Sequence, residues 1–178
     1  MAQATWVSLC LLPVLAVNSI PHKLLSTLPT LGVVDIVGVL LYVGGLAFEI
    51  EADRQKSQWS KEKKEKKHEE EFLTRGLWGK SRHPNYFGEV TLWTGIATLG
   101  AGVLATNAGV AGMGLNAGAG VWGRLLGVGL CALSPGFVSL LLFKVSGIPL
   151  SENKVSVTAS HLPFLVWGWV LESKRGED

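Results

Sequence analysis

Residues 31–50 read LGVVDIVGVLLYVGGLAFEI, and Asp35 and Glu49 are the only charged residues in this stretch. A helix needs about 20 mainly apolar residues to cross the hydrocarbon layer of a membrane. The stretch therefore predicts a membrane-spanning helix. Three further apolar stretches are predicted as spans for the same reason: residues 5–20, 86–106 and 125–143. We expect an all-α fold, a polytopic membrane helical bundle of about four transmembrane helices that forms a single domain over residues 1–178.

The charged residues are concentrated between the second and third predicted spans. Residues 51–83 contain ten of the sixteen Lys and Arg residues and seven of the fourteen Asp and Glu residues. A soluble globular protein distributes such residues over its whole surface. The formal net charge of +2 and the lack of a basic stripe also exclude a nucleic-acid-binding protein. Cys10 and Cys131 lie in apolar stretches, so they predict neither a disulfide framework nor a metal site.

The distribution of basic residues predicts the orientation in the membrane. Loops rich in Lys and Arg remain in the cytosol, which assigns the charged 51–83 loop to that side. With four spans, both termini and the tail 144–178 are then cytosolic as well. The segment 107–121 lies on the opposite side, and its high Gly and Ala content predicts a weakly structured, non-cytosolic loop.

Two segments leave an alternative open, and a third predicts a local distortion. Residues 5–20 resemble a signal peptide in hydrophobicity, although no Lys or Arg precedes them. The charge run at residues 60–71 predicts a solvated helix that extends the second span, with a lipid-headgroup or targeting patch as the alternative. Pro135 lies within the last predicted span and predicts a kink there.

Polar residues suited to bind a ligand occur at the ends of the second and third spans, next to the charged loop. Glu49 and Asp53 are four residues apart and would share one face of a helix. Arg82 and His83 precede Pro84, a residue that favours the start of a helix. On the first turns of that helix lie Asn85, Tyr86 and Glu89.

These side chains suit a ligand that carries phosphates, ribose hydroxyls and an amide, since Arg binds anionic oxygens and carboxylates accept bonds from hydroxyls. The simpler alternative is that the acidic and basic residues among them only pair with one another at the membrane surface. Glu89 favours a functional role, because a carboxylate several residues inside a span is costly to bury. Asp35 is a weaker case, because it lies near the start of its span.

Four sequence elements resemble one known family. They are Glu49-x-x-x-Asp53-x-Gln55, Gly76-Leu77-Trp78, Arg82-His83-Pro84-Asn85-Tyr86-Phe87-Gly88-Glu89 and Lys144-Val145-Ser146-Gly147-Ile148-Pro149-Leu150. In this order and spacing they resemble the steroid 5-alpha reductase C-terminal domain family, and more closely its DUF1295-like branch of fungal and bacterial membrane proteins. The resemblance extends from about residue 5 to residue 152.

The resemblance implies an all-helical membrane fold that binds NADPH from the cytosolic side. By similarity, Asp53 would contact the adenosine part of the cofactor, and Arg82 and His83 would lie near its phosphates. Toward the nicotinamide would lie Asn85, Tyr86 and Glu89. The implied enzyme is an NADPH-dependent oxidoreductase of lipid metabolism in the endoplasmic reticulum. It would transfer a hydride to a carbon–carbon double bond of a lipidic or steroid-like substrate.

Two departures from the family pattern favour a non-catalytic protein over an enzyme. Family members usually have additional membrane helices before the position that matches residue 5, and a basic, tyrosine-rich stretch after the segment 144–150. We therefore expect a relative that is shortened at the N-terminus and altered at the C-terminus. One alternative function is a shortened, non-catalytic paralogue that binds a nucleotide or helps a full-length relative to assemble in the membrane. A partner subunit or a homo-oligomer is also expected. Another alternative function is a membrane methyltransferase of the isoprenylcysteine carboxyl methyltransferase type, which shares an RHPxYxG-like element and binds S-adenosylmethionine.

Overall fold

The computed structural model describes residues 2–28, 31–70, 72–115 and 119–145. The chain divides into two compact units, Met1–Leu141 and Leu142–Asp178, and the helices discussed below belong to the first. The described residues form helices and turns without any strand. The helices are α1 (Ala2–Cys10), α2 (Leu12–Asn18), α3 (His22–Leu25), α4 (Val33–Lys64), α5 (Pro84–Leu104), α6 (Asn107–Gly112) and α7 (Gly120–Leu140), with a 3-10 turn η1 (Gly76–Gly79) before α5.

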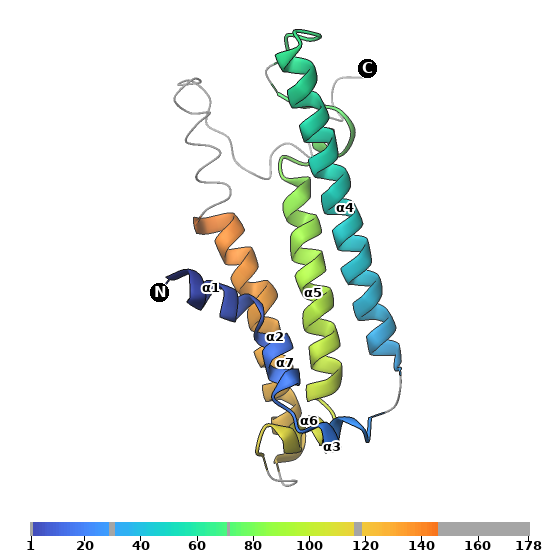
Figure 1. The fold of residues 1–178 in the computed structure, drawn as a ribbon, viewed down its shortest axis with the longest axis vertical. Coiled ribbons are helices and arrows are strands. Elements are labelled where there is room, and N and C mark those ends of the chain that lie inside the picture. The colour runs from blue at the N-terminus through green and yellow to red at the C-terminus, as the bar shows by residue number, and fades with distance from the viewer. Residues whose placement is uncertain (1, 29–30, 71, 116–118, 146–178) are drawn as a thin grey trace, which may run out of the picture. The chain divides into compact units, whose positions relative to one another are not determined.

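Three helical stretches are long and apolar enough to cross a membrane. They are Val33–Lys64, Pro84–Leu104 and Gly120–Lys144, the last of which begins with α7. They coincide with the second, third and fourth predicted spans. The all-α membrane bundle predicted from the sequence is therefore confirmed, with α4, α5 and α7 as its long helices (Figure 1).

The first predicted span, residues 5–20, is not one continuous helix. α1 ends at Cys10, α2 begins at Leu12, and Leu11 between them lies in a turn. Pro13 explains the break, because its ring nitrogen carries no hydrogen and cannot donate to the carbonyl four residues earlier. Of the four predicted spans, three are long helices, and the first consists of two short helices.

The charged segment 51–83 is partly helical rather than a loop throughout. α4 continues from its apolar part to Lys64, so the predicted helical extension is confirmed for residues 60–64, whereas residues 65–70 lie beyond the helix. Exposed ion pairs follow, with Lys67 at 2.6 Å from Glu65 and Arg75 at 3.3 Å from Glu70. Such exposed pairs contribute little to stability, so they do not fix the position of this segment.

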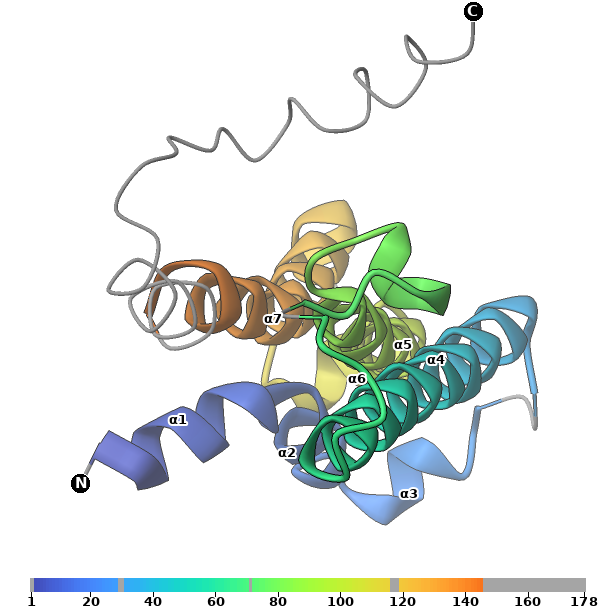
Figure 2. The same cartoon turned by 90° about the horizontal axis from the view of Figure 1, so that it is seen from above.

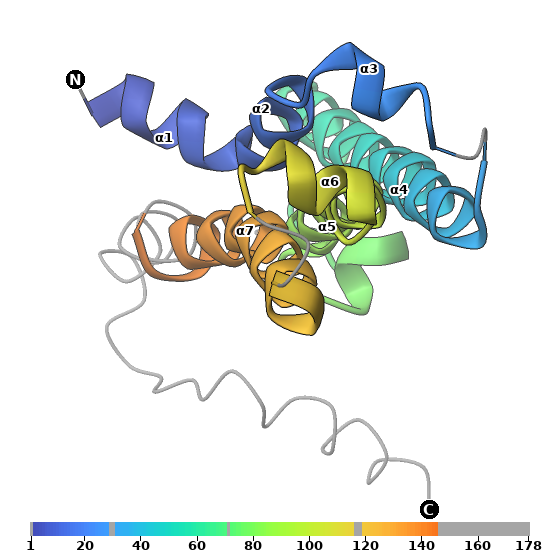
Figure 3. The same cartoon turned by 90° about the horizontal axis from the view of Figure 1, so that it is seen from below.

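The predicted weakly structured loop 107–121 contains a helix, so the prediction is wrong for Asn107–Gly112, which form α6. The Oγ1 of Thr106 accepts a 3.0 Å hydrogen bond from the amide of Gly109 and caps the helix, which offsets the low helix propensity of glycine. α6 lies beside α3 (Figure 3) and contacts it. Of the predicted tail 144–178, the residues from 146 onward lie outside the described part of the chain.

α5 is the central helix of the first unit. It contacts α4 and α7, and Figure 2 shows it between these two helices. α2 and α6 also pack against it. A small core consists of Ile20, Ala97, Leu104 and Cys131, and it joins α5 to α7 and to the turn after α2. Many large apolar side chains of α4 and α7 are exposed, as expected for helices whose outer surfaces face lipid.

Small residues repeat every seven positions along both helices of the α4–α5 pair. We call this set the glycine seam. Because seven residues complete about two turns of a helix, each helix presents its small residues on one face. All members except Gly102 are buried. The seam consists of Gly38, Gly45 and Ala52 on α4, and Gly88, Gly95 and Gly102 on α5.

The two helices run antiparallel, and their backbones touch along the glycine seam. A β-carbon added to Gly45 would lie 2.5 Å from the backbone nitrogen of Leu92, and one added to Gly88 would lie 2.7 Å from that of Glu49. Only glycine permits such an approach. In a membrane, where lipid tails are as apolar as the side chains, close van der Waals packing of this kind holds helices together.

Candidate functional site

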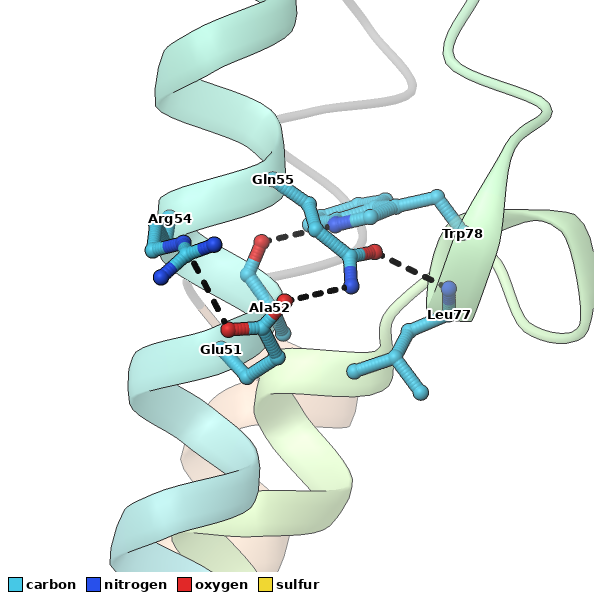
Figure 4. A network of polar contacts seen from close by, with 6 residues as sticks. All are labelled: Glu51, Ala52, Arg54, Gln55, Leu77 and Trp78. Atoms are coloured by element: carbon cyan, nitrogen blue, oxygen red, sulfur yellow. Dashed lines mark hydrogen bonds and ion pairs between the residues drawn. The ribbon is translucent and has the colours of Figure 1, made fainter.

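The turn η1 docks on the charged end of α4 through hydrogen bonds that are drawn in Figure 4. The indole Nε1 of Trp78 donates to the carbonyl of Ala52 at 2.8 Å. The amide of Leu77 donates to Oε1 of Gln55 at 3.0 Å, and Nε2 of Gln55 donates to Oε1 of Glu51 at 2.9 Å. Since 26 and 22 residues separate the partners of the two longer-range bonds, this docking is a tertiary contact.

Gly76 begins η1 in a conformation that favours glycine. Its φ is +61°, in the left-handed region, and an added β-carbon would lie 2.5 Å from Oε1 of Gln55. A side chain at this position would therefore be strained and would displace the acceptor of the Leu77 amide. The glycine of the Gly76-Leu77-Trp78 element is thus needed for the docking of the turn.

The RHPNYFGE element forms the start of α5. Pro84 is fully buried at the first helical position, where no amide hydrogen is required. The half-buried ring of His83 stacks on the ring of Tyr86, with centroids 4.8 Å apart and planes inclined by 7°. The amide of Tyr86 also donates to the carbonyl of His83 at 3.2 Å. This first turn therefore holds the two rings in one fixed arrangement.

Asn85 carries a buried acceptor for which the described residues provide no partner. The atom is Oδ1 of its side-chain amide. Nearly all buried polar atoms of folded proteins form hydrogen bonds, and an unpaired one costs about 1–3 kcal/mol. Because this atom lies in the first turn of α5, next to the stacked His83 and Tyr86, it is the candidate acceptor for a hydrogen-bond donor of a ligand.

Three carboxylates near this turn lie within electrostatic range of one another. Glu89 lies four residues after Asn85 and is near enough to interact electrostatically with Glu49 and Asp53 of α4. The contact of Gly88 with the backbone of Glu49 brings the two helices together at this point. Because like charges repel one another, this cluster favours a ligand that brings a positive charge or hydrogen-bond donors.

Two of the six candidates are exposed to solvent. Asp53 is exposed on α4, and Arg82 is exposed on the segment that leads into α5. A surface pocket of about 220 Å³ lies further along α4 and includes none of the six predicted residues. It is lined by Gln55, Gln58, Trp59, Glu62, Leu73, Arg75 and Gly76. In the structure the ring of His83 therefore lies on the ring of Tyr86, and Glu89 lies within electrostatic range of Asp53. None of these four residues lines that pocket.

Asp35, considered beside Glu89 in the sequence, has a structural role. Its Oδ2 accepts a 2.7 Å hydrogen bond from the amide of Gly32 at the start of α4. A carboxylate in the first turn also interacts favourably with the positive end of the helix dipole. This charge within an apolar stretch is therefore explained without a ligand.

Comparison with known proteins connects these residues to a family. The family described as "Protein of unknown function (DUF1295)" matches residues 1–162. The chain belongs to the DUF1295 family. No curated protein and no solved structure matches it. The predicted DUF1295-like resemblance is therefore confirmed, while the relation to the steroid 5-alpha reductases stays a prediction.

In this DUF1295 protein the sequence interpretation missed three residues that build the site. Gln55 and Trp78 stood in the recognised elements but received no role, and the structure uses them to dock η1 on α4. Gly88 also received none, although it sets the contact with Glu49. The repeat of small residues at every seventh position could have identified Gly88, whereas no local sequence pattern links Gln55 to Leu77.

Proposed function

We propose that this DUF1295 protein binds NADPH at the charged end of α4 and α5 and acts as a membrane oxidoreductase. The substrate class is a lipidic or steroid-like compound with a carbon–carbon double bond. The observation that carries the proposal is the buried Oδ1 of Asn85, which has no partner among the described residues and lies beside the His83–Tyr86 stack. We also propose that this end faces the cytosol, because it is rich in basic residues. The proposed location of the protein is the membrane of the endoplasmic reticulum.

The residues at this end fit the chemical groups of NADPH. The Oδ1 of Asn85 would accept a hydrogen bond from the nicotinamide carboxamide, and the ring stack offers a flat surface beside it. Glu89 and Asp53 would accept bonds from ribose hydroxyls, and the exposed guanidinium of Arg82 would bind phosphate oxygens.

The bound cofactor would supply the hydride, and the protein would supply binding, orientation and exclusion of water. Pro84 and Gly88 are buried behind the first turn of α5, so this turn is anchored against α4 and keeps its polar side chains in place. The exposed apolar surfaces of α4 and α7 give a lipidic substrate access from the membrane. The same surfaces would accommodate a partner subunit or a second copy of the chain.

One observation favours a second candidate, a methyltransferase that binds S-adenosylmethionine. The carboxylates of Glu49, Asp53 and Glu89 interact with one another. Three like charges attract a sulfonium cation and repel the phosphates of a dinucleotide. Both ligands carry an adenosine group. They differ in charge, because S-adenosylmethionine carries a sulfonium cation and NADPH carries phosphates, and this difference distinguishes the two candidate functions.

The first prediction concerns the affinity of the purified full-length chain in detergent for NADPH and for S-adenosylmethionine. NADPH is expected to bind more tightly. Arg82→Ala is expected to weaken its binding by about tenfold or more, because a charge-assisted bond to phosphate is lost. Lys80→Ala is the control, since it removes an exposed cation from the same segment without changing the residue assigned to the phosphates. Isothermal titration calorimetry with each ligand measures both effects.

The outcomes separate the candidate functions. Tighter binding of S-adenosylmethionine than of NADPH would reject the oxidoreductase in favour of the methyltransferase. Failure of both ligands to bind a folded protein would leave the non-catalytic paralogue. If NADPH binds but is never oxidised in the presence of a panel of lipidic enones, the protein holds the cofactor without being a reductase.

A further inference from the structure

Gln55 uses both ends of its side-chain amide. Its Nε2 donates to the carboxylate of Glu51 at 2.9 Å, and its Oε1 accepts from the amide of Leu77 at 3.0 Å. Gln58 forms the equivalent helical bond, in which its Nε2 donates to Glu62 at 3.1 Å on the exposed surface of α4. The two glutamines therefore share one local bond, and the bond to η1 distinguishes Gln55.

The partners of Gln55 require an amide at this position. Glu51 presents an acceptor and Leu77 presents a donor, and only a side chain that carries both a donor and an acceptor satisfies the two together. A carboxylate would still accept from Leu77 but would face the carboxylate of Glu51. An apolar side chain would leave the Leu77 amide without this partner.

Hydrogen bonds continue from Leu77 to the start of α5. The carbonyl of Leu77 accepts from the amide of Ser81 at 3.2 Å. The hydroxyl oxygen of Ser81 accepts from the amide of His83 at 3.3 Å. Each of these bonds is modest in strength, but together they connect the side chain of Gln55 to the residue whose ring stacks on Tyr86.

We infer that Gln55 is the positioning residue of the cofactor site, holding the segment from Leu77 to His83 in register with the carboxylates of α4. This inference rests on the proposed function, because the cofactor itself would contact Arg82, Asn85 and their neighbours rather than Gln55. Gln55 acts on binding only through the turn. A substitution of Gln55 should therefore weaken cofactor binding only when it breaks the hydrogen bond to Leu77.

The second prediction compares Gln55→Glu with the matched control Gln58→Glu. The measured quantity is the dissociation constant of NADP⁺, which tolerates acid, for the full-length chain in detergent. At about pH 8, Gln55→Glu is expected to weaken binding by about tenfold, since two carboxylates then face each other. At about pH 5.5 most of this loss is expected to disappear, because one of two facing carboxyl groups takes up a proton and donates to the other. Gln58→Glu should stay within about twofold of the unsubstituted protein at both pH values.

Amide hydrogen exchange tests the inference without any ligand. In Gln55→Leu the amide of Leu77 is expected to exchange about tenfold faster, whereas Gln58→Leu should leave it unchanged. Equal effects of the two glutamine positions, or a Leu77 amide that exchanges at the original rate in Gln55→Leu, would overturn the inference. Failure of the unsubstituted protein to bind NADP⁺ would reject the proposed cofactor, and the exchange measurement would then decide only whether Gln55 holds the turn η1.

Discussion

Gly45→Ala is expected to lower the free energy of unfolding by about 3 kcal/mol, near the upper end of the range for overpacked sites. The added methyl group would lie 2.5 Å from the backbone nitrogen of Leu92 and 2.7 Å from the carbonyl oxygen of Gly88. Both neighbours are backbone atoms, so no side-chain rotation relieves the clash. The helices α4 and α5 must separate, which weakens contacts along the whole glycine seam. Denaturant titration of the detergent-purified chain, followed by circular dichroism, measures the loss.

Gly44→Ala provides the matched control. Gly44 is the neighbouring residue on the same helix, and an added β-carbon there would meet nothing within 4 Å. The substitution is expected to be neutral or slightly stabilising, because alanine favours a helix over glycine by about 1 kcal/mol. If the two alanine variants unfolded at the same denaturant concentration, α4 and α5 would not be packed as described.

Asn85→Leu is expected to stabilise the ligand-free protein while abolishing most of its NADPH binding. Leucine has a similar size and removes a buried oxygen that no described residue satisfies, so the free energy of unfolding should rise by about 1–3 kcal/mol. The same change removes the acceptor proposed for the nicotinamide carboxamide, and affinity should fall by about tenfold or more. Denaturant titration without ligand and calorimetry with NADPH measure the two effects on one preparation.

Asn107→Leu is the control for this pair of measurements. The Oδ1 of Asn107 accepts a 3.0 Å hydrogen bond from Arg124, far along the sequence from the candidate residues. Losing this exposed bond should lower stability by at most about 1 kcal/mol and leave NADPH affinity unchanged. A destabilised Asn85→Leu variant that binds NADPH normally would show that Asn85 supports the fold and contacts no cofactor.

The spans could be predicted from the sequence because lipid imposes a simple condition, a run of apolar residues of sufficient length. That condition identified α4, α5 and α7. It does not detect local backbone geometry, so it joined α1 and α2 across the turn at Leu11. It also read the glycines of α6 as a loop, although the Thr106 hydroxyl caps a helix there.

Helical spacing predicts which candidate residues share a face within one helix. Asn85 and Glu89 are four residues apart, and the spacing alone places them on one face of α5. Helical spacing does not show that Glu89 approaches the carboxylates of α4, since that depends on how closely the two helices pack. The bond from Leu77 to Gln55 spans 22 residues, and whether it forms depends on the turn between them.

For the lipidic substrate proposed above, the backbone contact between α4 and α5 would exclude one route to the candidate site. Where Gly45 meets Leu92 and Gly88 meets Glu49, two main chains approach so closely that no hydrocarbon tail can slip between them. Under the proposed function, the lipidic substrate would therefore enter from the bilayer on another side of α5. α4 and α5 would then form one continuous side of the substrate path. Specificity for the shape of the lipid would come from the residues that face this helix pair.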